Sequence, residues 1–170
     1  MPMDGFVRDL GPCVLLFDGQ TYNTVGGATW SGEVVVKEIK RDDYGDVPVN
    51  KRTMGATSRV EANIVQPTWE QLEKVTPGGA VAGTMTTAFI VTNPVGMKLA
   101  GDSPKTLVVK PIIDGAPDTD EANWITFYNA APRPVVEVPF NVDGQRVYHV
   151  VWDAFPNGSQ KIYRIGPTPA

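Results

Sequence analysis

A chain of 170 residues is the size of one domain with a single core. Its formal net charge of -4 argues against nucleic-acid binding through bulk positive charge. The lone Cys13 excludes an internal disulfide and a cysteine-rich zinc site, and it favours an intracellular origin. No long apolar segment or secretory leader is evident, so we expect one soluble domain, residues 1–170, that is not exported.

The first half of the chain predicts strands that are separated by polar connections. A short apolar run predicts a strand over residues 12–19, and the polar residues 20–32 favour a connection or a weak edge strand. A longer strand is predicted over residues 33–42. In residues 58–67 apolar and polar side chains alternate, which is typical of a strand with one face in water.

One helix is predicted, and it begins at Thr68. Thr68 and Gln71 have the spacing of a capping box, in which each side chain binds a backbone N–H at the start of the helix. Trp69, Leu72 and Val75 then recur on one side, and a Pro-Gly pair ends the helix. We expect these three apolar residues to pack the short helix against a sheet, because two turns are not stable alone.

The second half predicts further strands, and turn-forming clusters separate them. These strands cover residues 87–93, 105–113, 124–130, 134–141, 146–155 and 161–166. Within residues 141–145 an Asp-Gly pair predicts a tight hairpin, because both turn positions need a positive φ. Strands dominate, so the sequence predicts a mainly β protein with one helix.

The sequence predicts no catalytic, metal or cofactor site. His149 lies within a run of strand formers and lacks a nucleophile motif, and Cys13 is expected to be inert core. An acidic loop lacks the offsets of an EF-hand and is expected to be solvated. The acidic residues of that loop are Asp114, Asp118, Asp120 and Glu121. A small β-barrel enzyme or ligand-binding protein that uses His149 and nearby acids remains the alternative.

Residues 39–55 form a charged segment without helical or strand periodicity. Structureless connections longer than about 12 to 15 residues are either functional or disordered, and both readings remain open from the pattern alone. The mixture of charges favours pairing with another copy of the chain in one register. The residues expected to make inter-subunit or inter-ring contacts are Lys40, Arg41, Asp42, Asp43, Tyr44, Asp46, Val47, Lys51, Arg52 and Met54.

The order of these features resembles the N-terminal half of tail tube proteins of long-tailed bacteriophages. The resemblance covers about residues 11–80: an early strand, a strand that enters the charged segment, a returning strand and a short helix. It implies two packed antiparallel sheets, of β-sandwich or barrel-like type, with one short flanking α-helix. It also implies hexameric rings that stack into a tube for genome delivery, because contacts that close within a ring can stay open along its axis.

By this resemblance a stacking arm at about residues 42–57 would reach the adjacent ring. The implied partners are further copies of the chain, other tail proteins and double-stranded DNA that passes through the lumen without specific binding, with no membrane bound. The chain would be a virion tail component, assembled in the bacterial host cytoplasm, and not an enzyme. Strand alternation suggests Glu61 and Asn63 as lumen candidates. The alternatives are a tail terminator, a baseplate ring protein or a type VI secretion tube protein.

Overall fold

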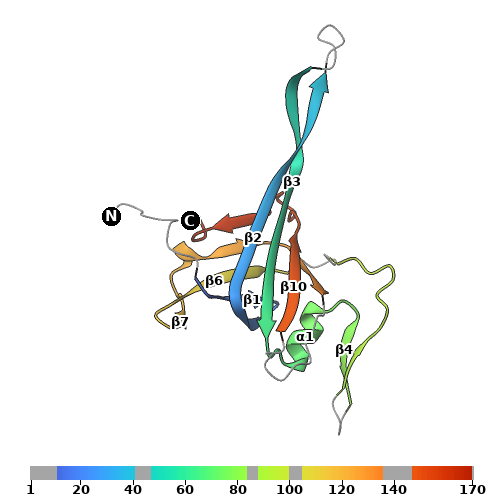
Figure 1. Cartoon of the computed structure of the whole chain (residues 1–170), viewed down its shortest axis with the longest axis vertical. Helices are drawn as coiled ribbons and strands as arrows, with labels where there is room; N and C mark the ends of the chain where they lie inside the picture. The colour runs from blue at the N-terminus through green and yellow to red at the C-terminus, as the bar shows by residue number, and fades with distance from the viewer. Residues whose placement is uncertain (1–10, 41–46, 84–87, 100–104, 136–146, 170) are drawn as a thin grey trace.

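An antiparallel sheet built around two unusually long strands dominates the molecule, shown as a computed structural model in Figure 1. The structure describes residues 11–40, 47–83, 88–99, 105–135 and 147–169. A small two-stranded sheet and a single α-helix complete the regular structure of these residues, apart from one 3-10 turn. The expectation of a mainly β chain with one short flanking helix is therefore confirmed.

The large sheet has the strand order β11-β8-β6-β1-β2-β3-β10-β9, with β7 paired to β6. Its strands are β1 (Cys13–Phe17), β2 (Gln20–Lys40), β3 (Pro48–Val65), β6 (Leu107–Ile113), β7 (Ala116–Pro117), β8 (Ile125–Phe127), β9 (Ala130–Val135), β10 (Val147–Ala154) and β11 (Tyr163–Ile165). The remaining elements are α1 (Trp69–Val75), the small sheet of β4 (Gly79–Ala82) and β5 (Ala88–Val91), and the 3-10 helix η2 (Glu121–Asn123).

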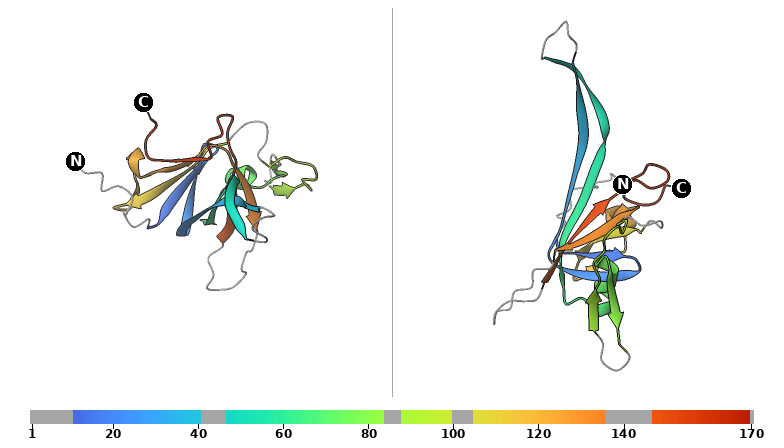
Figure 2. Two further views of the ribbon diagram at one scale, coloured as in Figure 1. Left: turned by 90° about the horizontal axis from the view of Figure 1, so that it is seen from above. Right: turned by 90° about the vertical axis from the view of Figure 1, so that its right-hand side faces the viewer.

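The sheet curls so that its two halves face each other across one core (Figure 2). Trp152 of β10 is fully buried and meets the rings of Phe17 and Tyr22 edge-on, at centroid distances of 6.2 and 6.4 Å. A backbone bond links the two halves where β9 begins, since the Ala130 N–H donates to the Lys105 carbonyl at 2.8 Å. The two predicted sheets are thus halves of one curled sheet.

Strand β2 belongs to both halves, because its two ends pair with different neighbours. Residues 20–23 pair with β1, and residues from Thr24 onward pair with β3. Gly26 and Gly27 lie at the change, with φ angles of 76° and 78°, and the register to β3 shifts there. Side chains other than glycine are strained at such angles, so the two glycines let the strand bend without breaking its ladder.

Two Asp-Gly pairs form the tight turns of the first half-sheet. Asp18 and Gly19 join β1 to β2 with φ angles of 48° and 77°, and Asp114 and Gly115 join β6 to β7 with 51° and 80°. Two-residue hairpins favour this geometry because its twist matches that of the strands. The hairpin expected within residues 141–145 lies outside the described residues.

Helix α1 begins with the predicted capping box and is fastened to β2. The Thr68 hydroxyl accepts from the Gln71 N–H at 3.2 Å, and the Gln71 side chain accepts from the Thr68 N–H at 2.8 Å. The Tyr22 hydroxyl donates to the Gln71 carbonyl at 3.1 Å, and the Gln71 amide donates to the Thr21 carbonyl at 2.7 Å. Burial, reinforced by the charge of Asp18, raises the pKa of Tyr22, so its phenol stays a donor.

A small ion-pair network joins the first turn to the helix and to the segment before β6. The Asp18 carboxylate accepts from Lys105 Nζ at 2.6 Å and lies 3.2 Å from Lys74 Nζ. Partial burial alone would raise the pKa of Asp18, but the two ammonium groups together hold that pKa below its ordinary value. The network therefore favours the charged carboxylate.

The structure corrects the predicted strand map in two places. Residues 20–32, expected to be a connection or a weak edge strand, form the first part of the central strand β2. Residues 48–57, expected to be patternless, form the first part of β3. In both cases pairing to a neighbouring strand outweighs weak local preference. Within the described residues, no helix has the length and apolar character needed to cross a bilayer.

Candidate assembly surface

The outer parts of β2 and β3 leave the body as a two-stranded ribbon, which we define as residues 32–40 and 48–57. Figure 1 shows it projecting along the long axis of the molecule, away from every other described element. Its ladder runs from the pair Gly32 and Ser58 out to Lys40 and Pro48, with register shifts at two places. Every residue of the ribbon is exposed. An isolated two-stranded ribbon is only marginally stable in water, so this one is suited to a partner.

The ribbon carries apolar side chains that the chain itself leaves uncovered. Val34, Val36 and Met54 are 58%, 48% and 60% exposed, and Val47 at its described end is 65% exposed. Further exposed apolar side chains are those of Val35, Ile39 and Val49. Basic and acidic residues lie between them, and Lys51 approaches Glu38 at 3.9 Å. The resulting surface mixes apolar and charged groups, as protein interfaces do.

One face of the ribbon continues the core face of the sheet. Strand pairing places Trp30 opposite Val60 in the body and Val34 opposite Ala56 in the ribbon, and residues two apart share a face. Trp30 packs on the core, and its indole N–H donates to the Ser58 hydroxyl at 2.9 Å. Beyond that bond the same face has no covering element among the described residues. Val34 and Ala56 therefore lie in solvent on the face that Trp30 and Val60 bury in the body, with Gly32 and Ser58 between the two pairs.

Five of the ten predicted contact residues fall on or beside this ribbon. Lys40 ends β2, Val47 directly precedes β3, and Lys51, Arg52 and Met54 lie in β3. The other five lie outside the described residues: Arg41, Asp42, Asp43, Tyr44 and Asp46. The described part of the expected arm, from residue 48 onward, is thus paired with β2 rather than structureless, and the ribbon already leaves the body at residue 32.

The solvent face of β3 and its neighbours carries balanced charge. The lumen candidates Glu61 and Asn63 lie on this face, opposite Val151 and His149 of β10. Arg59 contacts Asp153 at 3.1 Å and Glu61 at 3.9 Å, and Arg133 of β9 contacts Asp153 at 3.5 Å. Two guanidinium groups and two carboxylates thus neutralise each other across three strands.

His149 is part of this polar face and contacts the side chain of Asn63 on β3. Its Nδ1 lies 3.0 Å from the Asn63 side-chain oxygen, and no carboxylate contact to its ring is found among the described residues. The alternative of an enzyme centred on His149 therefore gains no geometric support.

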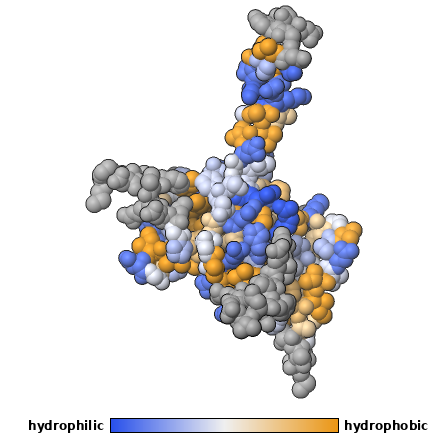
Figure 3. Space-filling view, viewed as in Figure 1, coloured by the Kyte–Doolittle hydropathy of each residue, from blue (hydrophilic) through white to orange (hydrophobic). Residues whose placement is uncertain are grey.

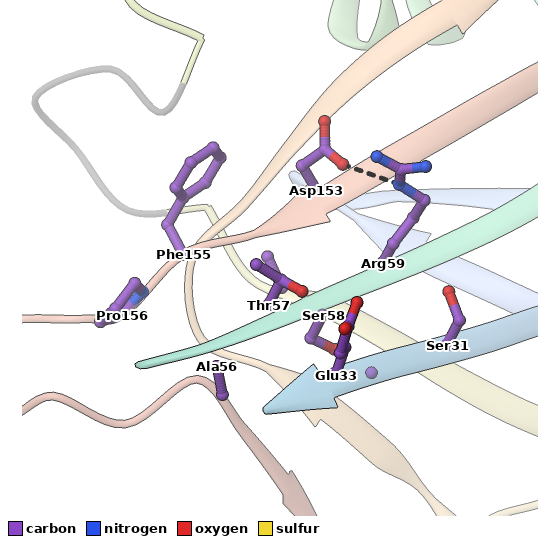
Figure 4. A pocket seen from close by; sticks show the side chains of 11 residues that line it. Ser31, Glu33, Ala56, Thr57, Ser58, Arg59, Asp153, Phe155 and Pro156 are labelled. Atoms are coloured by element: carbon purple, nitrogen blue, oxygen red, sulfur yellow. Dashed lines mark hydrogen bonds and ion pairs between the residues drawn. The ribbon is translucent and has the colours of Figure 1, made fainter. Parts of the chain in front are cut away.

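A cleft of about 730 Å³ lies where the ribbon leaves the body (Figure 4). Ser31, Glu33, Thr57 and neighbouring residues line one side, and Phe155 lies on the other. The Arg59 to Asp153 hydrogen bond spans its rim, so its opposite charges already satisfy each other. The cleft is therefore a concave surface at the base of the ribbon, and its lining does not form a set of reactive groups.

A second exposed apolar surface lies at the other end of the molecule, around α1 and β5. Its exposed residues, which we name the basal patch, are Trp69, Ile90, Val91, Val95, Met97 and Leu99. The helix residues Leu72 and Val75 are buried as expected. Trp69 is 48% exposed and stacks on Phe89 of β5 at 6.2 Å, so it packs on the small sheet.

The small sheet of the basal patch depends on two glycines after the helix. A Cβ on Gly78 would lie 2.3 Å from the Thr92 carbonyl oxygen, and one on Gly79 would lie 2.7 Å from the Phe89 ring. These glycines permit close approach of β4, β5 and the helix end. A groove of about 380 Å³ runs beside them, between α1 and the segment that contains Met97 and Leu99.

The remaining sequence-level candidates have structural roles. Cys13 is a buried free thiol whose pKa is raised by burial. Asp118 and Asp120 accept backbone N–H groups within their own loop, at 3.0 and 2.9 Å. Across the described ranges no three acidic, histidine or cysteine side chains are placed to hold a metal ion.

Known proteins give no further guidance, since no family model and no curated protein matches the sequence.

Proposed function

We propose that this chain is the structural subunit of a bacteriophage tail tube, which assembles into stacked hexameric rings around a conduit for the viral genome. The observation that carries the proposal is the ribbon, because a lone two-stranded projection with exposed valines is both marginally stable and prone to unwanted pairing. A neighbouring copy that covers it removes both problems. In this role the protein performs no reaction and needs no cofactor.

The body supports the same proposal through its sheet. A curled antiparallel sheet has two edge strands, here β11 and β9, and edge-to-edge contact between copies would join them into a ring. The balanced face formed by Arg59, Glu61, Asp153 and Arg133 would then line the lumen. A wall without net positive charge does not retain DNA by releasing its counterions, so the genome can slide past it.

The ribbon can be tested without touching the core. We would replace residues 35–55 by Asn-Gly, so that Val34 and Ala56, which already face each other, close a two-residue hairpin. The removed residues are exposed where described, so thermal unfolding and circular dichroism should match the intact chain. Negative-stain electron microscopy of concentrated protein should show tubes for the intact chain and none for the shortened variant.

A matched control is Val25→Thr, which changes an exposed valine of β2 outside the ribbon and should leave tubes intact. Tubes of normal length from the shortened variant would remove the stacking role of the ribbon. An intact chain that stays monomeric at millimolar concentration would contradict the tube itself. Rings that never stack would favour a terminator or baseplate ring protein instead.

A further inference from the structure

We propose that the ribbon of one copy docks on the basal patch of the next copy, a pairing that rests on the proposed tube. Figure 1 shows the ribbon projecting from one end of the long axis and α1 with the small sheet on the far side of the body from it, and both the ribbon and the basal patch display apolar side chains to solvent. Figure 3 shows hydrophobic residues both on the projecting ribbon and on the lower right of the body. The proposal thus names a receptor for the ribbon.

The exposure of the patch is the first argument. Val95 is 84% exposed, Ile90 and Val91 are 53% and 54% exposed, and Met97 is 53% exposed. Exposed apolar patches mark interaction sites in proteins. The groove beside Met97 and Leu99, at about 380 Å³, gives the patch a concave part that can receive protruding side chains such as Val36 or Met54.

Geometry makes the contact intermolecular. The ribbon points away from the patch within one copy (Figure 2), so it cannot fold back onto its own α1 and β5. Two different complementary surfaces at opposite ends give a head-to-tail contact, and such contacts repeat without closing when the copies are related along one axis. The same contact can therefore propagate a stack of any length.

Charge supports the choice of a second copy as the occupant. On the ribbon, Lys37 and Arg52 have no ion-pair partner within the described part of the chain. On the outward side of α1, Glu70 and Glu73 also have none there, although Lys74, which follows Glu73, is held by Asp18. The basic pair Lys37 and Arg52 of the ribbon thus complements the acidic pair Glu70 and Glu73 of α1. Complementary charges fix the register of an interface more than they increase its affinity.

A charge exchange tests the register. One variant carries Lys37→Glu with Arg52→Glu, a second carries Glu70→Lys with Glu73→Lys, and a third combines all four changes. Each pair alone should raise the critical concentration for stacking by about tenfold or more, because like charges then face each other. The combined variant should return toward the intact value, measured by light scattering and electron microscopy. A matched control exchanges Lys161→Glu with Glu121→Lys, both exposed and outside the two surfaces, and should change little.

A complementation experiment tests the pairing of the surfaces. The shortened variant with Asn-Gly in place of residues 35–55 keeps only the patch, and the variant Met97→Asp with Leu99→Asp keeps only the ribbon. Neither should stack alone. Their mixture should form a complex of finite size in analytical ultracentrifugation, because one copy offers a ribbon and the other offers a receptor but neither can extend both ways.

The outcomes separate this inference from the tube. Normal tubes from the Met97→Asp, Leu99→Asp variant, or no association in the mixture while the intact chain forms tubes, would overturn the ribbon-to-patch contact and leave the tube standing. Failure of the intact chain to assemble at all would overturn both. If the charge changes merely destabilised the patch, the variant with all four changes could not regain the stacking of the intact chain.

Discussion

Strands β2 and β3 each have an inner part in the body and an outer part in the ribbon, and the two parts differ in how their side chains are buried. In the body, Val60, Ala62 and Ile64 are buried, and Glu61 and Asn63 between them face water. In the ribbon, every position is exposed regardless of its polarity. The same covalent strands thus contribute a hydrophobic core at one end and an uncovered surface at the other. In the body, stability depends on burial, whereas the ribbon must obtain its burial from outside the chain.

Among the comparisons of buried with exposed positions, loss of a core ring should have the largest effect. Trp152→Ala removes a fully buried side chain and its contacts with Phe17 and Tyr22, and should lower the free energy of unfolding by about 3–5 kcal/mol. Urea denaturation measures this change. The matched variant Trp69→Ala, at a half-exposed position, should cost much less. Equal losses would mean that burial in this fold does not set stability.

A valine exchange isolates burial at constant size. Val150→Thr places a hydroxyl in the core without a partner and should cost about 1–3 kcal/mol. Val34→Thr makes the same change on the exposed ribbon and should alter the stability of the monomer by no more than about 0.5 kcal/mol. Thermal unfolding at low protein concentration compares them. A large loss at Val34 in the monomer would show that the ribbon already has a partner within the chain.

The helix cap provides a third comparison. Thr68→Ala removes the hydroxyl that accepts the Gln71 N–H and should cost about 1 kcal/mol. Thr57→Ala, at an exposed ribbon position, should be close to neutral. Denaturation monitored by Trp fluorescence and circular dichroism measures both variants. A neutral Thr68 variant would show that packing of Leu72 and Val75 alone holds α1 in place.

The smallest expected effect is electrostatic and depends on pH. Because the pKa of Asp18 is lowered in the folded protein, its contribution to stability is present above the pKa of the unfolded chain and is lost as the pH falls through the folded value. Asp18→Asn should therefore cost up to about 1 kcal/mol at pH 7. The asparagine keeps the turn, since it tolerates a positive φ.

Urea denaturation of the Asp18 variant at several pH values provides the measurement. The difference from the intact chain should shrink as the pH is lowered below about 4, where the aspartate of an unfolded chain becomes protonated. A difference that persists unchanged in acid would exclude the ion pairs of Asp18 as its cause.

The elements that were predictable from sequence are those whose signals are local. The alternation around Val60 and the Thr68 to Gln71 spacing identified a strand and a capped helix, and the structure contains both. The first part of β2 was not predictable, because the glycines at 26 and 27 suggest a connection. Pairing with β1 and β3, which depends on distant residues, makes a strand of it.

The candidate site was predictable only in part. The charge pattern drew attention to Lys51, Arg52 and Met54, which lie on the ribbon. The run Val34 to Val36 has the composition of a buried strand, and nothing local reveals that the chain leaves it uncovered. The basal patch was missed for a similar reason, since Ile90 and Val91 in a short apolar run give no sign of facing solvent.

The continuity of β3 from Pro48 to Val65 has a mechanical consequence. A pull on the ribbon from outside runs along the strand and reaches the buried ladder between β3 and β10 without passing through a hinge or a loop. The ladder bonds lie across the strand, so the load shears many of them together instead of opening them one after another. The projection is therefore a handle whose anchor is the interior of the molecule.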